Sequence, residues 1–378
     1  MRTHTLAVPA ALVLIAAGLI AGAAVAGPLN PPAGAVAPTA KPLADVEPRT
    51  AINAANTPGD TDSVYRISQP GSYYLTGNLT GAAGKSGIEI AASGVTIDLN
   101  GFELLGVPGS LSGTRPGATI SNVTVKNGSA RNWGEAGVSL SYFQVTGCRI
   151  DSVHASGNGG VGIVCGLGGV VTGCTASANT GGGIFAYSGG VVSGCAAYGN
   201  TGNGIGTTGG GHVVDCTSYV NTGTGISVGS GSTVSRCTVA ANGTYGITTS
   251  SSCTVADCTV RTSTLDGILC GGSGSQIRNN VCSINGNGGD GAGIVVASVE
   301  NKIEGNHCSN NDRGIDVQAA GNIIVRNTCA DNTVEWVIVA NNVYGPIINR
   351  SAPASAAVNG PAAASTLGST DPNANFTY

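Results

Sequence analysis

Charged and aromatic side chains are scarce in this sequence, and their scarcity narrows the functions open to it. Only 10% of the 378 residues are Asp, Glu, Lys or Arg, and only 4% are aromatic. An ordinary globular domain is roughly 25% charged. The formal net charge of -4 leaves no basic surface of the kind that nucleic-acid binding requires, so we exclude nucleic acid as a partner.

Long apolar runs are also missing, apart from one at the N-terminus. Arg2 precedes an apolar stretch from Leu6 to Val25, and Ala24-Val25-Ala26 has the small-x-small pattern of a cleavage site. We therefore predict a signal peptide over residues 1–26. The mature protein is then secreted or held in the cell envelope, without a membrane span. The alternative is an uncleaved membrane anchor.

Glycine, by contrast, is abundant, with 62 residues, and it marks a repeat. The dipeptide Gly-Ile recurs every 21 residues from Gly162 to Gly267, and it returns after one longer step at Gly293 and Gly314. A fixed period of this length is the sequence signature of a solenoid.

Aligned on Gly-Ile, the repeats place residues of one type in columns. One column is β-branched and apolar, a second is Cys and then Asn, and a third is Asn. Their members are Val171, Val192, Val213, Val234, Val255, Ile277, Ile303 and Ile324; Cys174, Cys195, Cys216, Cys237, Cys258, Asn280, Asn306 and Asn327; and Asn158, Asn179, Asn200, Asn221 and Asn242. Period-two alternation between Gly turns indicates strands. We predict an all-β solenoid, a single-stranded parallel β-helix of about 21 residues per coil, with coils stacked about 4.8 Å apart over an apolar interior.

Two stretches carry a resemblance to a known family. The later coils (NKIEGNHCSNNDRGIDVQAAGNIIVRNTC) resemble the repeats of the right-handed parallel β-helix, or pectate-lyase-like, superfamily, and the resemblance covers residues 85–345. The first coils (YRISQPGSYYLTGNLTG, then GIEIAASGVTIDLNGFELLG) resemble those of secreted bacterial β-helix proteins. The resemblance implies a right-handed helix and suggests carbohydrate binding or cleavage. Periplasmic copper-handling proteins carry similar repeats, and a fold does not imply a function.

The repeat also sets the domain boundaries. Residues 27–47 are rich in Pro, Ala and Gly and predict an extended linker. Residues 48–350 predict the β-helix domain, with N-terminal first coils and a terminal cap. Residues 351–378 predict a low-complexity tail, and the alternative is that Phe376 and Tyr378 dock as a cap.

Twelve Cys in a secreted chain would ordinarily suggest disulfides. Most of them, however, fall in one inward column, and no Cys-x-x-Cys pair of the kind that binds metal is present. A disulfide between in-register neighbours of parallel coils would be strained. We therefore predict mostly free thiols that fill the interior.

Two coils are longer than the others. From the apolar column to the Ile of Gly-Ile, the regular step is 13 residues. It is 18 between Val145 and Ile163 and 17 between Ile277 and Ile294. We expect both insertions to leave the same edge of the solenoid, about 29 Å apart. Insertions in solenoids commonly map to the binding face.

The second insertion places Asp290 in register with Asp266, Asp312 and Arg313. Several carboxylates beside one guanidinium suit an acidic sugar or Ca²⁺, which takes oxygen ligands. We take these four residues as the candidate catalytic group of a polysaccharide lyase. The alternative is an accidental grouping of polar loop residues. We expect no other cofactor.

The first insertion contains Arg149, Asp151 and His154, and His suits proton transfer near neutral pH. We include these three residues among the candidate substrate-binding residues, and the alternative is a solvated loop.

A tyrosine pair completes the candidate surface. Tyr198 and Tyr219 lie one coil apart and point outward by alternation, and Tyr245 lies nearby. Beside rows of Thr they predict a shallow platform for a polysaccharide. The alternative is a cross-coil pair that stiffens the sheet.

The remaining outward positions weaken the case for catalysis. After Gly-Ile the outward residues include one charged side chain, Asp316, and the repeat region has no adjacent pair of acids of the kind polygalacturonases use. We predict a secreted monomer that binds or processes extracellular polysaccharide along one edge of the solenoid. An enzyme of this kind would be lyase-like rather than a glycosidase. The alternative is a non-catalytic cell-surface protein with another ligand.

Overall fold

The computed structural model describes residues 47–141, 145–286, 289–349 and 370–377. The chain divides into two compact units, Met1–Pro48 and Arg49–Tyr378, and the strands described below all belong to the second. The predicted signal peptide and nearly all of the predicted linker lie outside the described residues. Within the described residues no helix is long and apolar enough to cross a membrane.

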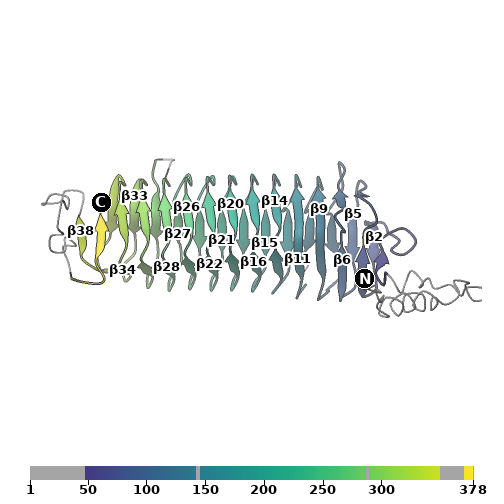
Figure 1. Ribbon diagram of the computed structural model, residues 1–378, viewed down its shortest axis with the longest axis horizontal. Coiled ribbons are helices and arrows are strands. Elements are labelled where there is room, and N and C mark those ends of the chain that lie inside the picture. The colour runs from purple at the N-terminus through teal and green to yellow at the C-terminus, as the bar shows by residue number, and fades with distance from the viewer. Residues whose placement is uncertain (1–46, 142–144, 287–288, 350–369, 378) are drawn as a thin grey trace, which may run out of the picture. The chain divides into compact units, whose positions relative to one another are not determined.

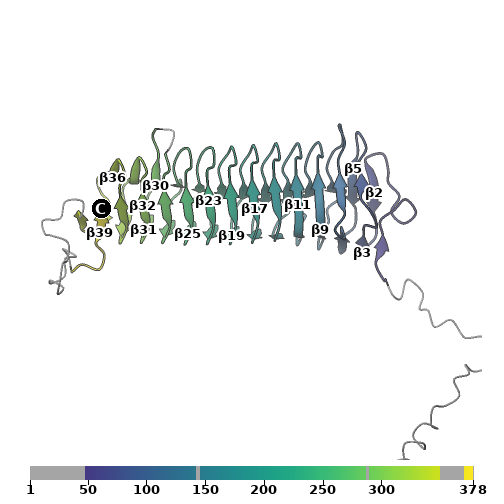
Figure 2. The same ribbon diagram turned by 45° about the horizontal axis from the view of Figure 1, so that its top comes forward.

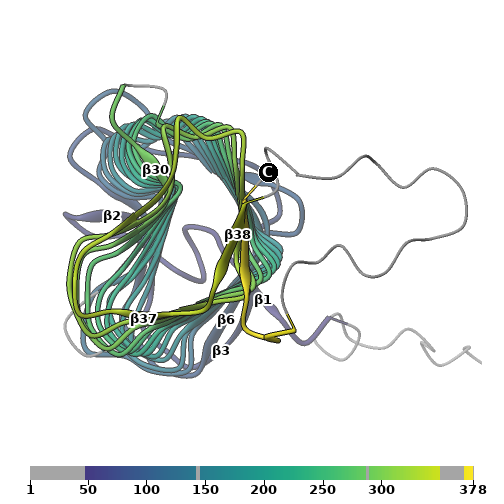
Figure 3. The same ribbon diagram turned by 90° about the vertical axis from the view of Figure 1, so that its left-hand side faces the viewer.

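The described part of this unit is a solenoid of parallel strands, as predicted (Figure 1). One strand of each coil belongs to a 13-stranded sheet, and the others belong to a 26-stranded sheet. Seen along the solenoid axis, successive coils superimpose on one another (Figure 3).

The 13-stranded sheet is formed by β2 (Ser63–Ile67), β5 (Ser86–Ile90), β8 (Thr114–Pro116), β10 (Val138–Leu140), β12 (Ile163–Cys165), β15 (Ile184–Ala186), β18 (Ile205–Thr207), β21 (Ile226–Val228), β24 (Ile247–Thr249), β27 (Ile268–Cys270), β30 (Ala292–Val296), β33 (Arg313–Val317) and β36 (Val334–Ile338).

The 26-stranded sheet is formed by β1 (Thr50–Ala51), β3 (Gly71–Tyr74), β4 (Leu79–Thr80), β6 (Val95–Asp98), β7 (Glu103–Leu105), β9 (Thr124–Arg131), β11 (Arg149–Ser156), β13 (Val170–Thr172), β14 (Thr175–Ser177), β16 (Val191–Ser193), β17 (Ala196–Tyr198), β19 (His212–Val214), β20 (Thr217–Tyr219), β22 (Thr233–Ser235), β23 (Thr238–Ala240), β25 (Thr254–Ala256), β26 (Thr259–Arg261), β28 (Gln276–Arg278), β29 (Val281–Ser283), β31 (Lys302–Glu304), β32 (His307–Ser309), β34 (Ile323–Val325), β35 (Thr328–Ala330), β37 (Val343–Tyr344), β38 (Ile347–Asn349) and β39 (Asn375–Thr377). Strands β11, β17 and β23 lie in one row of this sheet (Figure 2).

A buried ladder of asparagine side chains ties one corner of the coils together. Each backbone N–H from Asn158 to Asn221 donates to Oδ1 of the Asn one coil later at 3.1 Å. Each Nδ2 donates to the same oxygen at 2.8–3.0 Å. These side chains are at most 1% exposed, so the ladder satisfies backbone groups that water cannot reach.

The cysteine column takes the corresponding place at the next corner. The N–H of Cys174 donates to Sγ of Cys195 at 3.4 Å, and the Cys195 thiol donates to the carbonyl of Ser193 at 3.2 Å. Further along, Asn280 continues the column and accepts the N–H of Cys258 through Oδ1 at 3.0 Å. Sulfur thus replaces amide oxygen as the acceptor, and all twelve cysteines are buried free thiols.

The predicted position of the first insertion is wrong. Ile150 pairs with Val171, so Ile150 and not Val145 belongs to the apolar column, and the step from Ile150 to Ile163 is regular. The extra residues lie between β10 and β11 instead. The second insertion is confirmed between β29 and β30. The two expanded turns therefore leave different corners of the solenoid.

The predicted C-terminal boundary also needs correction. Phe376 lies in β39 and pairs with Thr328 of β35 and Ile348 of β38. Residues 375–377 therefore complete the 26-stranded sheet, which agrees with the alternative that Phe376 docks on the solenoid and not with a low-complexity tail there. Residue 378 lies outside the described residues.

The asparagine ladder makes a first testable prediction. Asn200→Ala leaves the buried N–H of Asn179 and the carbonyl of Ala176 without side-chain partners. We expect a loss of about 2–6 kcal/mol in the free energy of unfolding, since each of the two buried unpaired groups costs about 1–3 kcal/mol. Guanidinium unfolding measures the change. Thr201→Ala, an exposed neighbour, is the control, and equal midpoints for the two variants would contradict the ladder's role.

The thiols make a second prediction. Contact with Cys308 and burial raise the pKa of the Cys282 thiol well above its usual value, which keeps it protonated and unreactive. We expect a thiol reagent to react with few or none of the cysteines in the folded protein, because all twelve are buried. After unfolding it should titrate all twelve, with or without prior reduction. A count below twelve without reductant would demonstrate disulfides.

Candidate functional site

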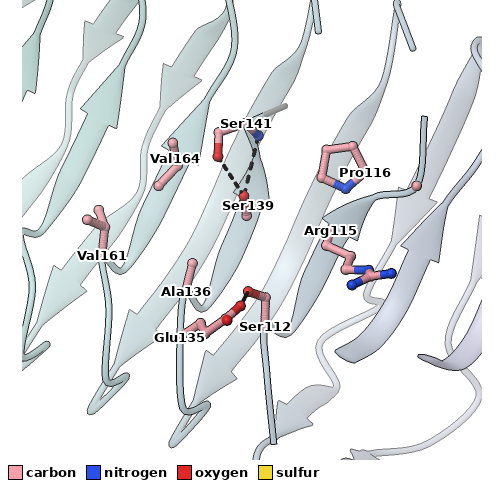
Figure 4. Close-up of a pocket in the computed structure, with 10 residues that line it drawn as sticks. Ser112, Arg115, Pro116, Glu135, Ala136, Ser139, Ser141, Val161 and Val164 are labelled. Atoms are coloured by element: carbon pink, nitrogen blue, oxygen red, sulfur yellow. Dashed lines mark hydrogen bonds between the residues drawn. The ribbon is translucent and has the colours of Figure 1, made fainter. Parts of the chain in front are cut away.

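A pocket of about 510 Å³ lies on the outer face of the 13-stranded sheet, over β8, β10 and β12 (Figure 4). Its wall combines charged, hydroxyl and apolar side chains. They are Ser112, Arg115, Pro116, Glu135, Ala136, Ser139, Ser141, Val161 and Val164, with the backbone of Gly117.

One end of the pocket is charged. Arg115 Nη2 lies 2.7 Å from Oε2 of Glu89, and Nε of Arg115 donates to the same oxygen at 3.1 Å. Arg66 approaches the other oxygen of Glu89 at 3.4 Å. Glu89 is buried, so the two arginines balance a carboxylate that has lost its water. Gly117 leaves the room for it, because a Cβ there would lie 2.4 Å from Oε1 of Glu89.

A carboxylate and several hydroxyls line the rest of the pocket. Ser112 donates to Oε2 of Glu135 at 2.9 Å, and the hydroxyls of Ser139 and Ser141 are 2.9 Å apart (Figure 4). Glu135 is exposed, so its second oxygen remains accessible to a ligand. Exposed carboxylates and hydroxyls in such a setting accept and donate hydrogen bonds to polar ligands.

The pocket continues along the sheet into a second depression of about 240 Å³. Val161 lines both hollows, and the second also contains Phe185 and Gly206. The ring of Phe185 lies over Gly206, where a Cβ would approach it to 2.9 Å. Phe185 also meets Tyr187 edge to face, with the ring centroids 5.1 Å apart. Polar and apolar surfaces thus follow one another along the outer face of the sheet.

This pocket was not predicted from the sequence, although a signal for it was present. Gly87-Ile88 precedes Glu89 as Gly-Ile precedes the outward residue of the later coils, and Gly137-Val138 precedes Ser139 in the same way. Extending the alignment toward the N-terminus would have placed Glu89, Arg115 and Ser139 in one outward row.

The four predicted catalytic residues do gather at the second insertion. Arg313 forms an ion pair with Asp290, and its Nε lies 3.0 Å from Oδ2 of Asp316, a residue outside the predicted site. Asp266 accepts the N–H of Ala292 at 2.8 Å. Asp312 accepts the N–H of Gly291 at 3.1 Å. The carboxylates of Asp266 and Asp312 therefore hold the residues that lead into β30, and their catalytic role stays a prediction.

The predicted substrate-binding residues of the first insertion lie on a regular strand, β11. Arg149 pairs with Asp151 in the same strand, with Nη2 of Arg149 3.0 Å from Oδ2 of Asp151, and His154 is exposed. These residues belong to the 26-stranded sheet, whereas the pocket lies on the other sheet. They therefore form no part of the pocket.

The tyrosine platform is partly as predicted. Tyr198 and Tyr219 pair in register on β17 and β20 and are 50% and 51% exposed. Tyr245 is half-buried in the turn between β23 and β24, outside that row of residues.

Two family models match the chain. A model described as "Right handed beta helix region" matches residues 106–256, within which the strands stack in parallel. The chain is a right-handed parallel β-helix protein. A model described as "Periplasmic copper-binding protein (NosD)" matches residues 210–349. No curated protein matches this sequence.

Solved structures resemble this β-helix protein in fold. The A-module of mannuronan C-5 epimerase AlgE6 from Azotobacter vinelandii is similar at 15% identity and a TM-score of 0.53, over 74% of this chain and 87% of that one. The catalytic domain of a GH87 α-1,3-glucanase is similar at 14% identity and a TM-score of 0.46, over 76% and 59%. At these identities the likeness concerns the fold alone.

The side chains that commonly bind metal ions are dispersed over the described part of the β-helix. Across the part of the chain that the structure describes, no group of three or more His, Cys, Asp or Glu is placed to hold a metal ion. His154, His212 and His307 lie on three separate strands, β11, β19 and β32.

The buried carboxyl of Asp266 makes a third prediction. Burial is the largest influence on its pKa, which is raised above the usual value although Arg313 opposes the shift. A raised folded-state pKa means that this group's stabilising contribution is present at low pH and is lost as pH rises through that pKa. Asp266→Asn keeps an oxygen for the Ala292 N–H without the buried charge.

We therefore expect the Asp266→Asn variant at pH 7 to be at least as stable as the parent, because the buried charge is removed. The difference should shrink below pH 4. Thermal unfolding at both pH values measures this. A variant that is clearly less stable at pH 7 would show that the charge itself holds the turn.

Proposed function

We propose that this β-helix protein binds polysaccharide in the pocket over β8, β10 and β12. The main support for the proposal is the kind of side chains that line this pocket. An accessible Glu135 carboxylate and the hydroxyls of Ser139 and Ser141 lie beside the apolar side chains of Val161 and Val164. A sugar ring presents the same mixture, hydroxyls at its edge and C–H groups on its faces.

The form of the site supports a chain-like ligand rather than a small molecule. The pocket runs into the second depression through Val161, so the hollow surface follows the stacked coils. The epimerase module supports the same class of ligand, since it is named for mannuronan. Its likeness to this chain is one of fold, and the pocket itself is the stronger support.

We propose binding rather than catalysis. Glu135 is the one carboxylate that lines the pocket, and no His, Lys or Tyr among the described residues joins it there as a proton carrier. Glu89 is buried behind Arg115 and is engaged by two guanidinium groups.

The signal peptide predicted at residues 1–26 favours a place outside the cytoplasm. The periplasmic description of the second family model supports the same location.

A lyase remains the second candidate function, because Asp266, Asp290, Asp312 and Arg313 gather around one turn. Incubation with uronic-acid polymers, with and without Ca²⁺, tests it through the ultraviolet absorbance of the unsaturated product. Product formation that is lost in the Asp266→Asn variant would establish the lyase. Its absence would leave binding.

The pocket makes a fourth prediction. Glu135→Gln removes a charge-assisted hydrogen bond to a sugar hydroxyl and should weaken binding about tenfold, whereas folding should be unaffected because Glu135 is exposed. Val161→Arg fills the junction of the two depressions and should abolish binding in the pocket. Calorimetry with neutral and acidic hexasaccharides measures both.

The matched control is Val343→Arg, which places the same side chain on the exposed strand β37. It should bind as the parent does. Equal affinities for Val161→Arg and Val343→Arg would refute the pocket as the binding site.

A further inference from the structure

Two exposed tyrosines stand side by side on the 26-stranded sheet, away from the pocket. Tyr198 and Tyr219 pair in register on β17 and β20, so one coil spacing of about 4.8 Å separates their positions. Each is half exposed, in a chain with only 4% aromatic residues. Neither belongs to the core, and exposed apolar groups that cluster on a protein surface commonly mark an interaction site.

A row of threonine hydroxyls runs beside the two rings. Thr217 lies two residues before Tyr219 on the same strand and therefore on the same outer side. It pairs in register with Thr238, which pairs with Thr259, and all three are exposed. The surface therefore combines aromatic faces with hydroxyl donors and acceptors, repeated at the coil spacing.

A guanidinium lies further along the tyrosine row. Tyr219 pairs with Ala240 and Ala240 pairs with Arg261, so Arg261 lies two coil spacings, about 10 Å, from Tyr219. Ala240 is small and leaves the path between them open. Arg261 is exposed, and within the described residues its guanidinium has no ion-pair partner. Arg236 on the same sheet, by contrast, is occupied by Asp215.

We infer that this surface is a second polysaccharide site and that it takes an acidic chain, one that carries carboxylate or sulfate groups. We call it the tyrosine face, formed by Tyr198, Tyr219, Thr217, Thr238 and Arg261. Sugar rings stack on the two tyrosines, the threonines bond their hydroxyls, and Arg261 takes an anionic group two coils further along. A planar guanidinium suits such oxyanions because it donates two parallel hydrogen bonds.

The tyrosine face gives the protein a further activity, the bridging of two chains. The pocket lies on the 13-stranded sheet and the tyrosine face on the 26-stranded sheet of the same solenoid. This consequence rests on the proposed function of the pocket, whereas binding at the tyrosine face does not.

A fifth prediction tests the face with a galacturonic acid hexasaccharide as the probe. The double variant Tyr198→Ala, Tyr219→Ala should lose at least tenfold in affinity at this site. Arg261→Gln should lose several-fold and should also reduce the dependence of the affinity on salt, because one exposed charge contact is gone. Arg236→Gln is the matched control and should bind as the parent does. Circular dichroism and the unfolding midpoint confirm that each variant is folded.

Two outcomes would overturn the inference. One is unchanged affinity in the double tyrosine variant. The other is equal behaviour of Arg261→Gln and Arg236→Gln.

The variants also separate this inference from the proposed function. If Val161→Arg abolishes hexasaccharide binding and the double tyrosine variant does not weaken it, the pocket is the binding site and the inference about the tyrosine face is refuted. If only the double tyrosine variant weakens binding, the tyrosine face is the binding site and the proposed function of the pocket is refuted. If both sites are real, the parent binds two hexasaccharides, each variant binds one, and the parent alone forms turbid complexes with long acidic polymers.

Discussion

The stacking of each coil on an equivalent coil, held by buried side-chain ladders, is the constraint on which the rest of this structure depends. Asn158, Asn179, Asn200 and Asn221 bond one another and the backbone at one corner, and the cysteine column does the same at the next. Water cannot replace these bonds, because the ladder positions are almost fully buried. A coil of another register would leave those groups unpaired, so the ladders hold the register as well as the coil spacing.

Inward positions are therefore uniform, and variation is left to the outward ones. In the middle coils the outward residues of the 13-stranded sheet include Phe185, Gly206 and Ser227, which carry no charge. Charged side chains on this sheet concentrate in the first coils, around Glu89, and in the later ones, around Arg313. The pocket forms where this charged group of the first coils meets the uncharged face.

The fold could be predicted from the sequence, because the 21-residue period and the alternation of apolar and polar residues are local properties of the chain. The buried thiols could be predicted as well, since a column of small residues must face inward. The prediction that Val145 belongs to the apolar column was wrong for an identifiable reason. Val145 precedes Cys148 by the three residues that separate Val171 from Cys174, so the pair imitates the repeat. The backbone instead aligns Ile150 with Val171, and Val153 occupies the ladder position, where its N–H meets the sulfur of Cys174.

By itself, then, the sequence determined that the chain is a parallel solenoid, which side chains face inward, and that Tyr198 and Tyr219 stand one coil apart. Only the tertiary structure decided which outward residues of different coils meet. Arg115 forms an ion pair with Glu89, which lies 26 residues earlier in the sequence. Arg313 forms an ion pair with Asp290 of the expanded turn. The physical reason is that such contacts depend on the register between coils. Where coil lengths vary, that register is set by the whole stack of hydrogen bonds and not by the spacing of any one motif.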